Sequence, residues 1–129
     1  MIHEEICTYE VCKLAKEKGF PQHIGDDAYV VENEYDDKYE VGCCYPIPFI
    51  PDYLPTIAAP TQSLLQRWLR EEKGLHISIP LHKGEYKYFW GIDSLNRKKK
   101  EEDITYNLFD TYELALSDAL KYALENLVI

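Results

Sequence analysis

Residues 60–79 read PTQSLLQRWLREEKGLHISI, and the spacing of their apolar side chains changes from helical to strand-like across one glycine. The apolar positions 64, 65, 68 and 69 recur as they do on one face of an amphipathic helix. After Gly74, every second residue from Leu75 to Leu81 is apolar, which is the period of a strand with one buried face. The stretch therefore predicts a helix over 60–73, with Pro60 in its first turn, followed directly by a strand.

The strand after Gly74 has a partner further along the chain. A turn at 82–85 leads to a second apolar alternation over 86–92, in which Tyr86, Tyr88 and Trp90 share one face. We therefore predict a β-hairpin over 75–92, and Pro80 places the end of its first strand at a sheet edge. A solvated loop over 96–103 and a short strand near 104–108 are expected to follow.

Two further helices are predicted near the ends of the chain. Thr8 can cap a helix, assigned to residues 5–18, that Gly19 ends. The terminal helix, over 111–127, is the most regular element, because its apolar residues keep helical spacing throughout. Either Asp110 or Thr111 can cap it.

Between the first two predicted helices, the regular patterns of apolar residues extend over shorter stretches. Residues 28–44 suit two short strands joined by an acidic turn. The connector at 45–60 contains five prolines, which exclude a helix and a central strand. Together the elements predict a single α+β domain over 1–129, in which three helices pack on a small antiparallel sheet.

Composition and charge narrow the classes of protein. The chain of 129 residues is 46% apolar and carries a net charge of −9. No apolar run reaches the ~18 residues that span a bilayer, so a cytoplasmic location without a membrane is expected. Residues 61–100 are the only basic part, and an acidic protein is repelled by nucleic acid at long range.

The residues that could hold a metal or act as a nucleophile lack the spacing of known motifs. They are four cysteines and four histidines: Cys7, Cys12, Cys43, Cys44, His3, His23, His76 and His82. We expect reduced thiols, because a chain of this size folds without disulfides. A Cys/His pair joining Cys43 or Cys44 to His76 or His82 has no local signature.

Other chemical signatures are missing too. The acidic residues between 26 and 40 lack the order of a calcium loop, and no phosphate-binding or hydrolase motif occurs. We therefore predict no metal, no cofactor and no catalytic residue, which favours a non-enzymatic function.

One alternative comes from the order helix then hairpin, which winged-helix domains use to place a recognition helix before a β-wing. Its candidate nucleic-acid surface consists of five bases: Arg67, Arg70, Lys73, Lys83 and Lys87. Against this interpretation, Glu71 and Glu72 lie beside the helical bases, and bases opposite an apolar stripe occur on any amphipathic helix. The order of elements also suggests a double-stranded RNA-binding domain, but the basic run 97–100 is not in that family's position.

Three segments contain recognisable sequence motifs. Residues 8–20 contain T-Y-E and then K-E-K-G-F, residues 59–70 contain A-P-T-Q and then W-L-R, and the last helix opens with Y-E-L-A. In order and wording they resemble small uncharacterised proteins of gut bacteria and their phages. The resemblance implies a phage or prophage accessory protein, and it assigns no site residue because the group has no established activity.

These observations favour an accessory protein that binds another protein, and they leave self-association open. The candidate partner surface consists of aromatic residues of the connector and the hairpin: Tyr45, Phe49, Tyr53, Tyr88 and Trp90. Aromatic side chains give a large contact area at a small cost in entropy. Any one of these rings could equally belong to the core.

Overall fold

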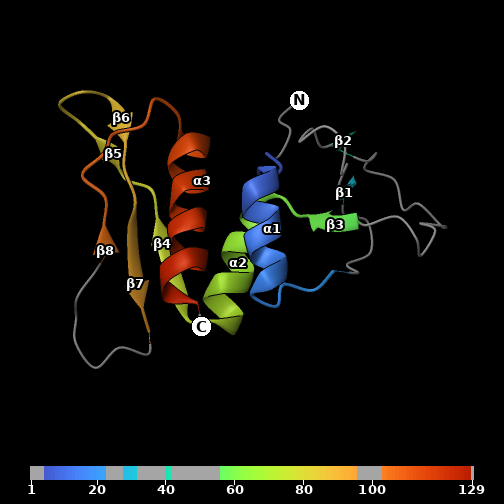
Figure 1. The fold of residues 1–129 in the computed structure, drawn as a ribbon. Helices are drawn as coiled ribbons and strands as arrows, with labels where there is room; N and C mark the ends of the chain where they lie inside the picture. Colours follow the sequence, from blue (N-terminus) through green and yellow to red (C-terminus); the bar gives the residue numbers. More distant parts are fainter. Residues whose placement is uncertain (1–4, 23–27, 32–39, 42–55, 96–102, 129) are drawn as a thin grey trace.

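The computed structural model describes residues 5–22, 28–31, 40–41, 56–95 and 103–128. In these residues the chain forms three α-helices and eight short strands, a mixed α+β fold as the sequence predicts (Figure 1). The helices are α1 (Tyr9–Glu17), α2 (Gln62–Glu72) and α3 (Tyr112–Tyr122), and a π-helical turn (Ala123–Leu127) follows α3. The strands are β1 (Ala28–Val31), β2 (Glu40–Val41), β3 (Thr56–Ala59), β4 (Leu75–Ser78), β5 (Leu81–His82), β6 (Lys87–Tyr88), β7 (Gly91–Ser94) and β8 (Asp103–Ile104).

The three helices lie between two groups of strands and begin at the same end of the molecule (Figure 1). On one side, α2 packs on β4, in the antiparallel sheet β4-β7-β8. On the other side, α1 packs on β3, in the antiparallel sheet β2-β1-β3. The expected small sheet is therefore split, with the helices between its parts.

Helix α1 begins at Tyr9 and not at residue 5. Thr8 caps it as predicted, since the Thr8 Oγ1 accepts the Val11 N–H at 3.3 Å. Residues 5–7 are extended instead, and Cys7 N–H donates to the Pro60 carbonyl at 3.0 Å. This pairing with the chain before α2 competes with an earlier helix start.

Gly19 ends α1 as expected, because its φ of 96° is one that glycine adopts without strain. The N–H groups of Gly19 and Phe20 donate to the Lys16 and Ala15 carbonyls, which is a Schellman motif. The motif turns Phe20 back into the core, where its ring meets the Trp68 ring edge-on at 5.3 Å.

Helix α2 is capped by Thr61, whose Oγ1 accepts the Leu64 N–H at 3.2 Å. Pro60 therefore precedes the cap, and its predicted place in the first turn is wrong by two positions. The helix begins after Thr61 because the threonine hydroxyl accepts one of the N–H groups that the first turn of a helix leaves unpaired. Proline has no side-chain group that can do this. Gly74 ends the helix at φ 66°, as predicted.

The hairpin over 75–92 is confirmed, in two ladders that share one register. Strand β4 pairs with β7, and Ile77 stands opposite Ile92. Strand β5 pairs with β6, and Leu81 stands opposite Tyr88. Between the ladders the Phe89 N–H donates to the Pro80 carbonyl at 3.2 Å. Because proline has no N–H to return, the pairing is interrupted there.

The second strand of the hairpin does not begin at Tyr86, which is a correction to the predicted shared face. Tyr86 has φ 55° and its N–H donates to the His82 carbonyl at 2.8 Å, so it belongs to the turn. Its side chain is 78% exposed, whereas Trp90 is buried.

The short strand predicted near 104–108 lies at β8 and continues as irregular pairing. Thr105 N–H donates to the Trp90 carbonyl at 3.1 Å, and Phe109 exchanges two backbone hydrogen bonds with Tyr88. The strand is interrupted because Ile104 pairs with Gly91, which leaves two extra residues before Phe109 meets Tyr88.

In the region 28–60, the predicted pairing of two short strands is confirmed for β1 and β2, and their turn lies outside the described residues. The connector was expected to be extended, with no helix and no central strand, and its described part, β3, is an edge strand. β3 pairs with β1 at the edge of its sheet, in the proline-free run between Pro55 and Pro60.

Helix α3 resolves the choice of cap in favour of Thr111, whose Oγ1 accepts the Leu114 N–H at 3.1 Å. The predicted helix over 111–127 becomes π-helical from Ala123, and the Val128 N–H donates to the Ala123 carbonyl at 3.0 Å. Tyr112, the first residue of α3, continues the helical spacing of the apolar residues but is 40% exposed.

The core lies where the helices meet the strands. Leu65 and Leu69 of α2 and Leu120 of α3 are fully buried, as are Ile92 of β7 and Ile57 of β3 at 1% exposure. Among the described residues, no helix is long and apolar enough to cross a membrane.

Candidate functional site

The predicted partner surface is divided by the structure. Tyr45, Phe49 and Tyr53 lie outside the described residues. Tyr88 is half-buried, and Trp90 is only 3% exposed. Trp90 therefore belongs to the core, which is the alternative that the sequence left open for each of these rings.

Trp90 connects the sheet to α3. Its Nε1–H donates to Asp118 Oδ2 at 2.8 Å, and its ring lies 4.9 Å from the Tyr122 ring. Tyr88 makes a similar contact, edge-on with the Tyr112 ring at 6.0 Å. Tyr88 and Trp90 thus both face α3 and hold it on the sheet.

The face of the sheet that turns away from the helices carries exposed apolar side chains instead. There a hollow of about 280 Å³ is lined by six residues: His82, Phe89, Ile104, Thr105, Tyr106 and Leu108. We call it the outer hollow. Tyr106 is 97% exposed and Ile104 is 46% exposed. Because Ile104 stands opposite Gly91, no side chain from β7 covers it directly.

Sequence reasoning missed the outer hollow. Its residues come from two segments, 82–89 and 104–108, and the second was expected to be a simple strand. A regular strand would have alternated its side chains between the core and solvent. The irregular pairing after Ile104 breaks that alternation. The only signal in the sequence that could have suggested the hollow is the short strand at β8 together with the loop that follows it.

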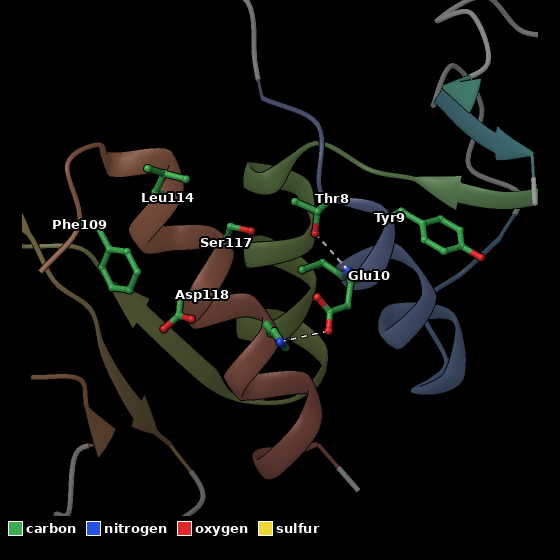
Figure 2. A pocket seen from close by; sticks show the side chains of 9 residues that line it. Thr8, Tyr9, Glu10, Phe109, Leu114, Ser117 and Asp118 are labelled. Carbon is green, nitrogen blue, oxygen red and sulfur yellow. Dashed lines mark hydrogen bonds and ion pairs between the residues drawn. The ribbon is translucent and has the colours of Figure 1, made fainter. Parts of the chain in front are cut away.

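A second concave region lies between α1 and α3 and is shown in Figure 2. Its volume is about 420 Å³. From α1, Thr8 and Glu10 line it, and from α3, Leu114, Ser117 and Asp118. At one end, Lys121 Nζ pairs with Glu10 Oε1 at 3.1 Å and joins the two helices.

A neighbouring hollow, also of about 420 Å³, shares Thr8, Leu114 and Ser117 with the first. It extends the depression past Glu5 to the first turn of α3, at Glu113. We call the combined depression the α1–α3 groove.

A buried side chain fixes one wall of this groove. Gln62, in the first turn of α2, is 5% exposed, and its Nε2 donates to the Glu113 carbonyl at 3.0 Å. This bond ties the start of α2 to the start of α3. The groove is therefore built on helix ends whose relative positions are set by packing.

The charges of the groove are predominantly negative. Its ionisable lining in the described residues consists of Glu5, Glu10, Glu113, Asp118 and Lys121. The hydrogen bond with Glu10 raises the pKa of Lys121 above its ordinary value, and the attraction of Glu10, Glu125 and Asp118 adds to the effect. The lysine is therefore held in its charged form and balances only one of the four carboxylates.

The two described cysteines, Cys12 in α1 and Cys7 just before it, are part of the core. Cys7 and Cys12 are buried, and the Cys12 Sγ–H donates to the Cys7 carbonyl at 3.6 Å. Burial raises the pKa of Cys12 from 9.0 to about 12 and raises that of Cys7 further. Because the thiolate is the reactive form, neither group is a nucleophile at neutral pH.

No group of three or more potential metal ligands comes together within the described parts of the chain. His76 is exposed on β4 and His82 lines the outer hollow. Their predicted partners Cys43 and Cys44 lie outside the described residues, as do His3 and His23. The acidic residues from 26 to 37 lie outside them too.

The five bases of the alternative nucleic-acid surface are in two places. Arg67, Arg70 and Lys73 belong to the second half of α2 and its C-cap, and Lys83 and Lys87 belong to the tip of the hairpin. Residues 75–82 separate the two groups and, at ~3.3 Å per residue, carry the chain roughly 25 Å away from the end of α2. Figure 1 shows β5 and β6 far from that helix end. Nucleic-acid binding stays a prediction, and it would need two separate contacts.

Several of these bases already have partners. The Arg67 Nε lies 3.0 Å from Glu71 Oε1, and the Lys87 Nζ lies 3.4 Å from Asp110 Oδ1. Lys73 Nζ lies 5.3 Å from the centre of the Trp68 ring. The Arg67–Glu71 pair is a local feature of the helix, whereas the Lys87–Asp110 pair joins the hairpin to the segment before α3, and exposed pairs of this kind contribute little to stability.

The described residues form a small α+β fold with two concave surfaces, the outer hollow and the α1–α3 groove. No protein-family model, no curated protein and no solved structure matches the chain.

Proposed function

We propose that this chain is a non-enzymatic accessory protein of the phage or prophage type, and that it binds another protein through the outer hollow. The observation that supports the proposal most directly is the exposure of Tyr106 and Ile104 on a sheet face that no described helix covers. Large exposed apolar side chains grouped in a concave surface are typical of interaction sites.

The chemistry of the outer hollow favours a protein partner over a substrate. Its lining contains the imidazole of His82 but no carboxylate, amine or thiol, and its other residues are apolar or carry a hydroxyl. Such a lining offers area and shape but no carboxylate to act with the imidazole in acid–base chemistry. Burial of an isoleucine-sized side chain contributes about 1.5–3 kcal/mol, so Ile104 and Tyr106 could supply a hot spot.

The accessory role rests on the wording of residues 8–20, 59–70 and the start of α3, which resembles phage and gut-bacterial proteins. Two of those segments contain the threonine caps of α1 and α2, and the first also contains Gly19, which ends α1. They therefore describe the scaffold, while the outer hollow lies elsewhere, on the sheet.

Site-directed photo-crosslinking in the native host tests the proposal. A photoreactive phenylalanine analogue at Tyr106 should give a discrete crosslinked product, and the same analogue at Arg67, exposed on α2, should not. The Ile104→Ser substitution should reduce the product at Tyr106 at least about fivefold, since the loss of apolar contact weakens binding. Equal products at both positions, or none at Tyr106, would contradict binding through the outer hollow.

A further inference from the structure

The α1–α3 groove offers a second surface, distinct from the outer hollow, and its chemistry specifies what it can hold. We propose that the groove binds a lysine- or arginine-bearing segment of a partner protein, with an apolar side chain of that segment placed against Leu114. This inference goes beyond the proposed function, because it names another surface and the chemistry of its occupant.

The apolar part of the argument rests on Leu114. This side chain is 55% exposed, and it lines both hollows of the groove. Phe109, half-buried in the segment before α3, lines the first hollow on the same side as Leu114 (Figure 2). One apolar side chain of a partner would remove both from water.

The charge of the groove selects a basic segment. Four carboxylates and one ammonium group leave an excess of three negative charges in its lining. The positive ends of the three helices that begin here offset about 0.5 charge each, so the groove stays negative. A lysine or arginine would complete the charge balance, whereas a phosphate or an acidic peptide would be repelled.

Two polar groups in the middle of the groove are available to such a segment. Asp118 uses Oδ2 to accept from Trp90, and its Oδ1 accepts no hydrogen bond from the described residues. Ser117, one residue earlier, lines both hollows, and its hydroxyl likewise has no hydrogen bond within the described chain. In Figure 2 both residues are on the α3 wall of the groove, between Leu114 and the Glu10–Lys121 pair.

The test measures fluorescence anisotropy of a labelled 14-residue helical peptide with leucines at positions i, i+3, i+4 and i+7 and lysines at its polar positions. Two double variants remove the same charge from the protein. The groove variant is Glu113→Gln with Asp118→Asn, and the matched control is Glu85→Gln with Asp93→Asn, outside the groove. The Asp118→Asn change keeps a carbonyl oxygen that can accept the Trp90 N–H, and circular dichroism verifies the fold of both proteins.

The groove variant should weaken peptide binding about tenfold and the control less than about twofold, because only the groove charges contact the peptide. Leu114→Ser, at an exposed position, should weaken binding about fivefold with no loss of helix content. A peptide with glutamates in place of the lysines should not bind.

Equal weakening by both double variants would show a general attraction to an acidic protein and would overturn the proposal. An unchanged affinity in the groove variant would overturn it as well. Neither result depends on the outer hollow, so this inference and the proposed function can fail separately.

Discussion

At the scale of single residues, three threonines determine where the helices begin, whereas the state of two cysteines depends on their tertiary surroundings. Each helix begins at a threonine whose hydroxyl accepts an N–H from the third helical residue. Such caps are readable from sequence, because the cap and its N–H lie within one turn. The state of a thiol is not readable in this way, since burial depends on residues far along the chain.

The burial of Cys7 and Cys12 predicts a loss of stability at alkaline pH. Both thiols have pKa values raised above 9.0 in the folded protein, that of Cys12 to about 12, chiefly by burial. Well below pH 9 both states keep the protons and stability is complete. As the pH rises through 9 the unfolded thiols ionise first, so the free energy of unfolding should fall, with a slope that approaches about 1.4 kcal/mol per pH unit for each thiol.

Urea unfolding at pH 8, 9 and 10 under reducing conditions measures this dependence. A Cys43→Ser, Cys44→Ser background removes the other thiols. In it, Cys12→Ala should reduce the loss of stability between pH 8 and pH 10 by about 1.4 kcal/mol in total, the contribution of one thiol. Lys121, whose pKa is also raised, contributes a loss in the same direction, and it cancels in this comparison. An identical slope with and without Cys12 would contradict the assignment.

At the scale of elements, the hairpin shows where local pattern succeeds and where it ends. The alternation after Gly74 predicted the strand pair, and the shared register of its two ladders confirms it. The tip of the hairpin escaped prediction, because a tyrosine in a left-handed conformation is uncommon and nothing in the alternation marks it. Tyr86 was therefore assigned to the strand, and the structure places it in the turn.

The conformation of Tyr86 predicts that Tyr86→Gly stabilises the protein. A left-handed backbone costs a non-glycine residue about 1–2 kcal/mol, and glycine loses about 0.5–1 kcal/mol more entropy on folding. The free energy of unfolding should therefore rise by about 0.5–1 kcal/mol in chemical denaturation. Tyr106→Gly is the matched control, since Tyr106 is also exposed but does not have a positive φ, and it should be destabilising. Destabilisation by both changes would refute the role of the turn.

At the scale of the whole molecule, the sheet and the helix layer meet through few polar contacts, and the bond from Trp90 to Asp118 is one of them. Their positions in the sequence are 28 residues apart. The bond joins the buried Trp90 to a residue that also lines the α1–α3 groove.

A double-mutant cycle tests this connection. Trp90→Phe should lower the free energy of unfolding by about 1–3 kcal/mol, because it removes a hydrogen bond to a charged group and leaves space where the indole was. Asp118→Ala should cost less after Trp90→Phe than in the wild-type protein, with a coupling energy of about 1 kcal/mol. Strictly additive losses, measured by urea unfolding, would mean that the bond contributes nothing.

The amino-acid sequence by itself determined the α+β class, the three helices, the hairpin and most of their ends. These features follow from period, caps and glycine stops, all of which act within a few residues. Only the tertiary structure decided which side chains form surfaces. Three features depend on segments that are far apart in the sequence and adjacent in the fold. They are the burial of Trp90, the exposure of Tyr106 in the same hollow as Phe89, and the ion pair between Glu10 and Lys121. Such contacts depend on how whole layers of helices and strands pack. The periodicity of one element predicts which of its faces is buried, but not which element covers that face.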